Sequence, residues 1–467
     1  MAEIVFNGKP LTVNPLKVSQ PMGAALALLG MHRAIPLEHG AQGCTAFSKV
    51  FFTRHFREPV PLQTTAMSHL VTVMGADQHI IEALETLSDR ERPDLIGLVT
   101  TGLSELQGAD VGRALEQFRE RHPEHRRVQV VTVNTPDTLG SLESGYALAV
   151  EAMIRTLVPE SRKAGQHPWQ VNVLASSMLT PGDIEALRAW IEAYGLHPLF
   201  LPDLSGSMDG HLDPEGFCNL TQGGLTQSEL GYMGKSVATL VVGASMAGAA
   251  DLLRERTGIP DHRFESLMGL ADCDAFSQTL AALAGASIPR SIERIRAQLM
   301  DAMVDCHIVL GGARVALAAD PDLLTMLGRF VTGLGAELCA AVTSARAPVL
   351  ASLPAERVWI GDLEDLEGSA RRHDAQILLA SSHGVPVARR LGIPILRAGF
   401  PIHDAAGAQA RQWVGYGGSR QALFDLTNLL MDQRQNVRPY RSIFWQGSPR
   451  DGEPLPAQPY HPAAAGA

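Results

Sequence analysis

Short apolar runs alternate with longer stretches of helical spacing along most of this chain. LIGLVTT (residues 95–101) and VQVVTVNTP (128–136) lie on either side of a polar helical stretch. VNVLASSM (171–178) and SVATLVVG (236–243) continue the pattern, and each is followed by a helical segment. Strands made of continuous apolar residues are typical of parallel sheets that helices cover on both faces. The sequence therefore predicts an α/β fold with mainly parallel sheets and flanking helices.

The same alternation recurs three times, which predicts three doubly wound, Rossmann-like domains. A chain of 467 residues is too long for one ordinary core. A polar and charged break, PESRKAGQHPW, separates a first domain at 1–165 from a second at 166–288. We place the third domain at 289–445. Residues 446–467 are rich in Pro, Gly and Ala, and we expect them to form a flexible tail.

Two local features of this layout are specific enough to test. Thr180 followed by Pro181 predicts the N-terminus of a helix. In the third domain, a long helix over 288–305 is expected to precede a strand at CHIVLGG (306–312). Gly311-Gly312 would then follow a strand, as in half of a dinucleotide-binding loop, although the third glycine of such a loop is missing.

The charge and hydropathy of the chain argue against two kinds of partner. The formal net charge is -10 at pH 7 and the Lys and Arg residues form no long run, whereas nucleic-acid binding needs a basic surface. The N-terminal segment has neither the basic nor the apolar region of a secretion signal, and no later stretch is an uninterrupted apolar run. We expect a cytoplasmic protein that binds no nucleic acid and no membrane.

Five cysteines are spread through the chain, at positions 44, 218, 273, 306 and 339. The number is odd and the sequence contains no C-x-x-C pair, which is unlike a disulfide framework or a self-contained zinc site. Any iron–sulfur cluster bound here would need further ligands from elsewhere. Apart from Cys44, we expect the cysteines to be packing residues.

Cys44 lies in the segment HGAQGC, just before a stretch of helical spacing, TAFSKVFFTRHF. Gly40 and Gly43 allow close approaches of the backbone that other residues resist. A helix start near the sulfur places N–H groups and the positive end of the helix dipole beside it, which favours thiolate over thiol. The local residues leave two interpretations open, which are a ligand thiolate and an inert cysteine at a loop–helix junction.

Four segments together resemble the β-type subunits of the nitrogenase component 1 superfamily, and most closely the NifN family of cofactor-assembly scaffold subunits. The first two are long and specific, and the resemblance extends to about residue 445. It implies that Cys44 is a thiolate ligand of an iron–sulfur cluster held where this chain meets a partner subunit. The segments are SQPMGAALALLG (19–30), HGAQGCTAFSKVFFTRHFREPV (39–60), LVTTGLSELQGAD (98–110) and VNTPDTLGSLESGY (133–146).

The departures from the catalytic β-type subunit are informative. That subunit offers three cysteines to a large interfacial cluster, and only the one at Cys44 remains here. Ser19 and Gly102 stand at the other two positions, and Asp137 stands where the family has a cluster-adjacent serine. Glycine offers no side-chain ligand, so the resemblance implies a [4Fe-4S] cluster with one ligand from this chain and three from the partner, in place of an eight-iron cluster.

Further residues are candidates for the surroundings of the cluster and for docking. Ser19 and Asp137 have oxygen atoms that can ligate iron. His39 and Gly43 belong to the Cys44 motif, and His39 is expected to orient the loop through a hydrogen bond to backbone. Met74 aligns with an aromatic residue on the docking face of the catalytic relative, and an ordinary packing role is the alternative.

The resemblance also implies the partners. The family pairs with a NifE-type α subunit in an α2β2 heterotetramer that receives a precursor of the iron–molybdenum cofactor. The precursor is held mainly by the partner and is matured there with molybdenum and homocitrate. The ATP-dependent iron protein (NifH) assists, and it docks where the first-domain loops of both subunits meet.

Other motifs resemble sites but fit them poorly. GYMGKS (231–236) ends like a phosphate-binding loop, yet Glu229 replaces the required first glycine and the motif precedes a strand. The acidic run GDLEDLEG (361–368) can ligate a divalent ion, but acidic residues at a helix start are usually solvated partners of the dipole. The histidines of the first domain are possible iron ligands or ordinary structural residues. They are His32, His39, His55, His69 and His79.

Three functions remain to be separated. The first is a non-catalytic assembly scaffold for the iron–molybdenum cofactor in nitrogen fixation. The second is the catalytic β-type subunit of a nitrogenase or of a related protochlorophyllide or chlorophyllide reductase; the loss of two cysteines disfavours a nitrogenase, and FFTRHFREPV (51–60) disfavours those reductases. The third is a plain α/β binding module, which the Cys44 segment disfavours.

Overall fold

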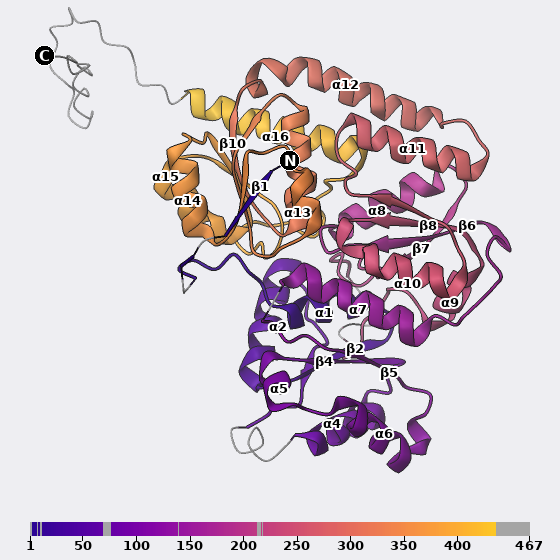
Figure 1. The fold of residues 1–467 in the computed structure, drawn as a ribbon. Coiled ribbons are helices and arrows are strands. Elements are labelled where there is room, and N and C mark those ends of the chain that lie inside the picture. The colour runs from indigo at the N-terminus through magenta and orange to yellow at the C-terminus, as the bar shows by residue number, and fades with distance from the viewer. Residues whose placement is uncertain are drawn as a thin grey trace, which may run out of the picture.

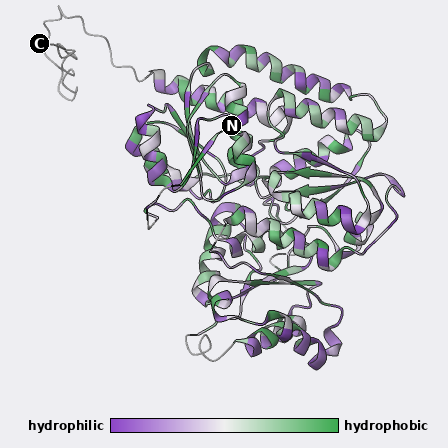
Figure 2. Ribbon diagram, in the orientation of Figure 1, coloured by the Kyte–Doolittle hydropathy of each residue, from purple (hydrophilic) through white to green (hydrophobic). Residues whose placement is uncertain are grey.

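The computed structural model consists of three parallel sheets with helices on their faces, arranged as three lobes (Figure 1). It describes residues 2–6, 8–9, 12–68, 76–138, 140–212, 216 and 218–435. Figure 2 shows hydrophobic residues along the strands, whereas the helices carry both hydrophobic and hydrophilic residues. The predicted α/β class is confirmed. No helix in the described part of the chain has both the length and the apolar character that crossing a membrane requires.

The first sheet forms the lower lobe of Figure 1 and has the strand order β3-β2-β4-β5. Helices α4 and α6 pack on one face of it, and α1 and α7 pack on the other. The strands are β2 (Ala34–His39), β3 (Gln63–Thr64), β4 (Leu95–Thr100) and β5 (Gln129–Val133). The helices are α1 (Gln20–Leu28), α2 (Gln42–Phe56), α4 (Asp77–Arg90), α5 (Gly102–Gln107), α6 (Val111–Arg121), the 3-10 turn η1 (Pro123–His125) and α7 (Leu142–Leu157).

Helices α1 and α7 approach each other closely through glycines. A Cβ atom on Gly23 would lie 1.9 Å from the backbone oxygen of Leu142, and one on Gly145 would lie 2.0 Å from that of Gln20. No side chain fits at these separations, so glycine is required at both positions. The contact matters for function because the segments that precede both helices line the candidate site described below.

The second sheet has the order β7-β6-β8-β9. Thr180 caps α8 as predicted, because its Oγ1 accepts a hydrogen bond of 3.0 Å from the Asp183 N–H and Pro181 opens the helix. Lys235 ends η2 and Ser236 is the first residue of β8, so the motif leads into a strand, which agrees with the prediction that it is no phosphate loop. The elements are β6 (His167–Ala175), α8 (Pro181–Glu192), β7 (His197–Leu201), α9 (Gln227–Tyr232), η2 (Met233–Lys235), β8 (Ser236–Val242), η3 (Ala244–Met246), α10 (Ala247–Thr257), β9 (Asp261–Phe264) and α11 (Leu270–Ala284).

The third sheet has the order β1-β12-β11-β10-β13-β14. Two long helices, α12 and α16, pack together at the top of Figure 1. The elements are β1 (Glu3–Phe6), α12 (Arg290–Leu310), β10 (Arg314–Ala318), α13 (Pro321–Gly333), β11 (Glu337–Thr343), η4 (Pro348–Ser352), β12 (Arg357–Ile360), α14 (Leu363–Arg372), β13 (Ile377–Ala380), η5 (Ser382–Gly384), α15 (Val385–Leu391), β14 (Ile395–Arg397) and α16 (Gly415–Gln435).

Strand β1 corrects the expected layout. The sequence prediction placed the first residues in the first domain, but Glu3 pairs with Arg357 and Phe6 with Ile360 in the third sheet. Lys9 then joins the acidic run at the start of α14, with its Nζ 2.7 Å from an Asp362 oxygen. A lysine therefore lies against the carboxylates that could have ligated a divalent ion.

The apolar run after residue 305 is also corrected. It was predicted to form a strand, but Cys306–Leu310 is the last part of α12, and the strand begins at Arg314. Buried residues recur at helical spacing through this helix, at Leu299, Ala302, Cys306 and Leu310. Gly311-Gly312 consequently follows a helix and is not half of a dinucleotide-binding loop.

Three buried carboxyl groups lie where the domains meet. The Asp322 N–H, in the first turn of α13, donates a 2.8 Å hydrogen bond to Glu143 Oε2 in the first turn of α7. Ser245 of η3 donates to Asp322 through its N–H at 3.2 Å and its hydroxyl at 2.6 Å. Asp320 accepts from the Ser344 hydroxyl at 2.7 Å. Each carboxyl group thus accepts at least one hydrogen bond, and the cluster connects all three domains.

Burial raises the pKa of all three carboxyl groups, and the neighbouring carboxylates raise those of Glu143 and Asp322 further. Hydrogen bonds from Ser245 and from the backbone act in the opposite direction for Asp322. Because a buried carboxylate is costly without such donors, the junction is stable only while the three domains keep this arrangement.

We expect Asp322→Ala to lower the free energy of unfolding by about 1–3 kcal/mol, because the Ser245 N–H and hydroxyl lose their acceptor in a buried place. Asp322→Asn keeps an acceptor and should restore most of that loss. Asp301→Ala, at an exposed position of α12, is the control and should change stability by less than about 0.5 kcal/mol. Urea unfolding measures all three, and equal stabilities of Asp322→Ala and Asp301→Ala would contradict this account.

Candidate functional site

A pocket of about 490 Å³ lies where strands of the first sheet end. Cys44 follows β2, Gly102 follows β4 and Asp137 follows β5, and Ser19 precedes α1. Ligands of open parallel sheets bind at the carboxyl ends of the strands. All four positions that the resemblance relates to cluster ligation therefore line one pocket.

Cys44 is the third residue of α2 and is exposed. Its N–H donates to the Ala41 carbonyl at 3.1 Å, so the predicted helix start is correct. The predicted effect on the thiol is wrong for the chain alone: burial, then the Glu38 carboxylate and the Asp137 carboxylate, raise the pKa of Cys44. A hydrogen bond from the Cys44 backbone acts in the opposite direction and does not offset them. Bound iron favours the thiolate and would reverse this preference.

The residues around Cys44 offer few other ligands. Among the described residues, Cys44 is the one thiol that lines the pocket. In the described part of the chain, one group of three His, Cys, Asp or Glu side chains lies close enough together to share a metal ion, and it lies outside this pocket. The pocket therefore fits a group that takes one ligand here and the rest from another chain. It does not fit a cluster held by this chain alone.

Glu38 positions Cys44, and sequence reasoning missed it. It is buried in β2 and accepts hydrogen bonds from Thr45 Oγ1 at 2.7 Å and from Ser48 Oγ at 3.0 Å. These contacts fasten the first two turns of α2 to the sheet. Burial raises the pKa of Glu38. A glutamate within the otherwise apolar strand AIPLEH was the available signal, because buried charges are rare unless they have a use.

Asp137 has a structural task. Its Oδ1 accepts from the Gln20 N–H at 2.9 Å, and its own N–H donates to Gln20 Oε1 at 3.0 Å. Lys17 Nζ donates to the Asp137 carbonyl at 2.8 Å and lies 3.4 Å from Oδ1. The carboxylate thus caps α1, whereas the Ser19 side chain makes no capping bond. The geometry leaves the Ser19 hydroxyl at the pocket and occupies one oxygen of Asp137.

His39 lies on the opposite face of β2 from Glu38, because neighbouring strand residues point to opposite faces. Its Nδ1 is 3.0 Å from Thr65 Oγ1, and burial lowers its pKa to about 4. The ring therefore does not make the predicted hydrogen bond to backbone. Instead, the Thr101 hydroxyl donates to the His39 carbonyl at 3.0 Å.

The two glycines of the motif differ. A Cβ atom on Gly40 would lie 2.6 Å from Thr101 Oγ1, so this position needs a glycine for the close approach of the two loops. A Cβ atom on Gly43 would have no neighbour within 4 Å. Gly43 is exposed in the first turn of α2, and nothing in this chain requires its small size.

Apolar side chains surround the pocket on its open side. On α2, Phe47 is 70% exposed and Val50 is 51% exposed, and on α5, Leu106 is 85% exposed. Phe47 and Leu103 line the pocket itself, and Leu106 lies one helical turn beyond Leu103. We call these four residues the apolar rim. Groups of exposed apolar side chains often mark interaction sites.

The far end of α2 is bound to the third domain through His55. Its Nδ1 accepts a hydrogen bond of 2.9 Å from the Ile402 N–H, and its ring lies 4.8 Å from that of Phe400. Burial lowers the pKa of His55 to about 3. The ring is therefore neutral, and its Nδ1 is occupied by the Ile402 N–H.

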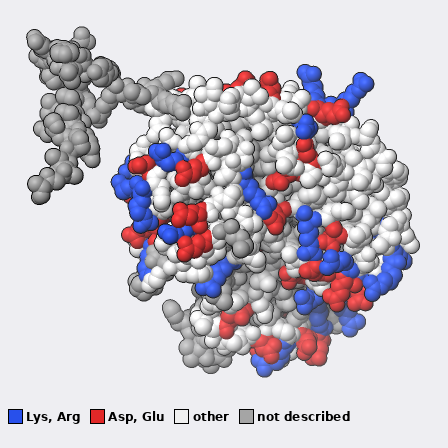
Figure 3. Space-filling view, turned by 45° about the horizontal axis from the view of Figure 1, so that its top comes forward, with Lys and Arg blue, Asp and Glu red and all other residues white. Residues whose placement is uncertain are grey.

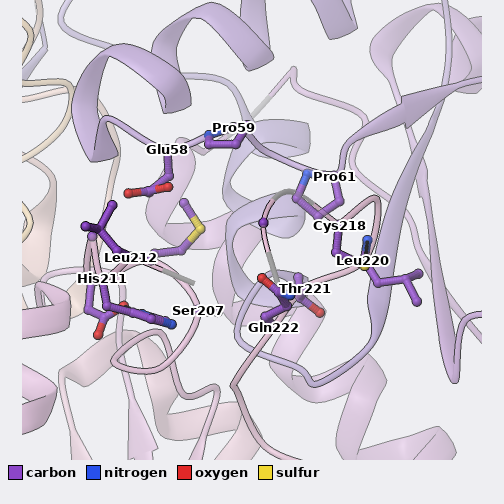
Figure 4. Close-up of a pocket in the computed structure, with 14 residues that line it drawn as sticks. Glu58, Pro59, Pro61, Ser207, His211, Leu212, Cys218, Leu220, Thr221 and Gln222 are labelled. Carbon is purple, nitrogen blue, oxygen red and sulfur yellow. Dashed lines mark hydrogen bonds and ion pairs between the residues drawn. The ribbon is translucent and has the colours of Figure 1, made fainter. Parts of the chain in front are cut away.

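The remaining sequence candidates contribute nothing to this pocket in the described part of the chain. Met74 and His69 fall outside the described residues. Cys273 and Cys306 are buried, as predicted for packing residues. Cys218 lines a different pocket, of about 270 Å³, in which Figure 4 shows Cys218 and Leu220 at one end and Glu58 and His211 at the other.

The surface charge agrees with the exclusion of nucleic acid. On the face drawn in Figure 3, Lys and Arg side chains are interspersed with Asp and Glu, and the described residues form no continuous basic tract there. A polyanion would meet repelling groups beside attracting ones on that face.

Comparison with known proteins identifies relatives along almost the whole chain. The family model described as "Nitrogenase component 1 type Oxidoreductase" matches residues 19–431. A protein of Klebsiella pneumoniae named "Nitrogenase iron-molybdenum cofactor biosynthesis protein NifN" is 46% identical over 442 residues, which cover 95% of this chain and 96% of the relative. A protein of the same name from Rippkaea orientalis is 44% identical over 450 residues, with 93% and 97% covered.

Solved structures agree. A chain of "Nitrogenase Cp1 at pH 6.5" superposes with a TM-score of 0.87 at 29% identity, covering 94% of this chain and 97% of that one. A chain of "Nitrogenase Cp1 at pH 5" has a TM-score of 0.68 at 14% identity, with 92% of each chain covered, and it supports the fold alone.

The buried His55 predicts a pH dependence. The folded pKa of about 3 lies below the ordinary value of 6.5, so the unfolded chain binds a proton between these values and the folded chain does not. The contribution of His55 to the free energy of unfolding is therefore complete above pH 6.5. It falls by about 1 kcal/mol for each pH unit of acidification below that value. His55→Gln keeps an acceptor for the Ile402 N–H but has no titrating ring, so its stability should lack this pH-dependent contribution.

Urea unfolding at pH 7.5, 6.5 and 5.5 measures the effect as the difference between wild type and His55→Gln. His262→Gln, at an exposed position of β9, is the control and should follow the wild type. Parallel pH profiles of wild type and His55→Gln would refute the assignment.

Proposed function

The chain belongs to the nitrogenase component 1 type oxidoreductase family, and from this premise we propose that it is a scaffold subunit in the biosynthesis of the nitrogenase iron–molybdenum cofactor. The relatives that bear a cofactor-biosynthesis name are more than 40% identical over almost their full length. Such similarity across all three domains supports a shared role and a shared assembly.

One observation supports a specific role for Cys44 within this function. Cys44 stands as a single exposed thiol at a pocket whose described residues provide no second cysteine. We propose that it gives one thiolate ligand to a [4Fe-4S] cluster, and that a NifE-type α subunit gives the other three. The cluster supplies an electron-carrying centre at the boundary of the two subunits. Glu38 holds the start of α2 in place for this, and Ser19, Asp137, His39 and Gly43 surround the sulfur or support its loop.

The apolar rim supports the placement of the partner. Its side chains flank the opening of the pocket on α2 and α5, and exposed Gly43 leaves the first turn of α2 accessible at close range. An α subunit that covers the rim would bury apolar surface and bring its own cysteines to the same opening. Two such pairs form the proposed α2β2 heterotetramer.

The other functions belong to the complex. We propose that the cofactor precursor is held mainly by the α subunit, because the described residues of this chain place one thiol at the pocket and no group of three or more metal ligands beside it. The ATP-dependent iron protein (NifH) would dock on the loops of the first domain, where Met74 is a candidate contact.

Cys44→Ala in the complex with its α subunit is expected to remove close to four irons per αβ pair, because the cluster loses its one ligand from this chain. Iron analysis and electron paramagnetic resonance of the reduced complex measure the loss. Cys218→Ala, which changes a thiol in the other pocket, is the matched control. Unchanged iron content and an unchanged spectrum in Cys44→Ala would sink the proposal.

An enzymatic role is the second candidate, and the family description and the 29% identity to a nitrogenase chain favour it. In this role the chain would be the β-type subunit of a nitrogenase or of a nitrogenase-like reductase. Ser19 and Gly102 stand where the resemblance expects cysteines, which counts against the eight-iron cluster of a nitrogenase. Acetylene reduction by the complex, with iron protein and ATP, separates the two, since substantial turnover requires the enzymatic role and its absence agrees with the scaffold.

A further inference from the structure

A second group of possible metal ligands lies at the outer end of the first domain, at the turn after α6. His122, Glu124 and His125 each offer one ligand atom, and these three atoms lie within 4.8 Å of one another. His122 Nδ1 is 3.3 Å from Glu124 Oε1. Two ligands bound about 2.1 Å from one tetrahedral ion are about 3.4 Å apart, so His122 and Glu124 already lie at the separation that a shared ion needs, and His125 lies within 4.8 Å of both.

The two imidazoles are held in place by their surroundings. The side chains of His122 and His125 are only 17% and 12% exposed. Their rings lie 6.1 Å apart and stack with the ring of Phe118, at 5.5 Å and 6.2 Å. Arg119 fixes the backbone of the turn, because its guanidinium donates to the carbonyls of His125 at 2.9 Å and Val128 at 2.7 Å. A preformed site loses little entropy on binding.

Carboxylates of α4 complete the surroundings. Asp89 Oδ1 is 3.1 Å from His125 Nε2, and Glu85 Oε2 is 3.9 Å from His122 Nε2. Carboxylates beside metal-bound histidines commonly orient the rings and increase their basicity. The turn also follows the C-terminal end of α6, where the helix dipole favours a cation. The guanidinium of the nearby Arg121 donates hydrogen bonds to the side-chain amide oxygens of Gln78 and Gln117.

We propose that His122, Glu124 and His125 bind a divalent transition-metal ion of the Zn²⁺ type, which fixes the turn at the end of α6. Imidazole together with one carboxylate is a ligand set for zinc and its neighbours, whereas magnesium and calcium prefer oxygen ligands alone. Three protein ligands leave a fourth position for water or for an adjoining carboxylate. The site is independent of Cys44, and it holds its ion with residues of this chain alone.

Zinc analysis tests the proposal. The full chain in its complex is incubated with Zn²⁺, freed from excess by gel filtration and analysed by mass spectrometry for zinc per chain. The wild type should carry one more zinc ion per chain than His122→Asn/His125→Asn, and the same difference should persist in a Cys44→Ala background. His262→Asn, at an exposed histidine of β9, is the control and should match the wild type.

A second variant keeps the test decisive if the double variant does not fold. Glu124 is 60% exposed, so Glu124→Gln should fold normally and bind zinc at least tenfold more weakly in a competition titration with a chelating dye. Zinc should also raise the melting temperature of the wild type and of His262→Asn, but not that of the double variant. Equal zinc content in wild type and double variant, or equal affinity in wild type and Glu124→Gln, would overturn the proposal.

Discussion

The arrangement of the molecule depends on a hydrogen-bonded cluster of buried carboxyl groups between its three domains. Glu143 accepts from the backbone of α13, and Asp322 accepts from η3. Glu143 is the second residue of α7, and the loop before α7 carries Asp137, which caps α1 beside the Cys44 pocket. The position of the pocket relative to the other two domains therefore depends on these buried hydrogen bonds.

The sequence predicted what local patterns determine. Continuous apolar runs gave the parallel strands, and Thr180 with Pro181 gave a helix start, because both signals lie within a few residues. The pairing of β1 with β12 was not predictable in this way, since its partner is about 350 residues away. The run at Cys306–Leu310 was misassigned because a short apolar segment suits a strand or a buried helix equally well.

In the candidate site, too, local sequence patterns predicted some features and long-range contacts determined others. Motif positions indicated that Cys44 belongs to a site, and the structure places it in one pocket with the other positions of interest. The effect of its surroundings could not be read from the motif. Burial raises the pKa of the thiol, and Glu38 and Asp137, which come from other elements, raise it further. Electrostatic environment depends on tertiary proximity, which spacing along the chain does not reveal.

Strand β1 also has a consequence for the order of folding. It is an edge strand of the third sheet and pairs with β12, of which residues 357–360 form the register. During synthesis the first residues leave the ribosome long before their partner exists, and domains generally fold in the order in which they emerge. The first two domains can therefore fold while β1 is still unpaired. Its later pairing with β12 brings the N-terminal segment into the third domain. A nascent chain that ends before β12 leaves β1 without its partner strand, so the third sheet cannot be completed until residues 357–360 have been synthesised.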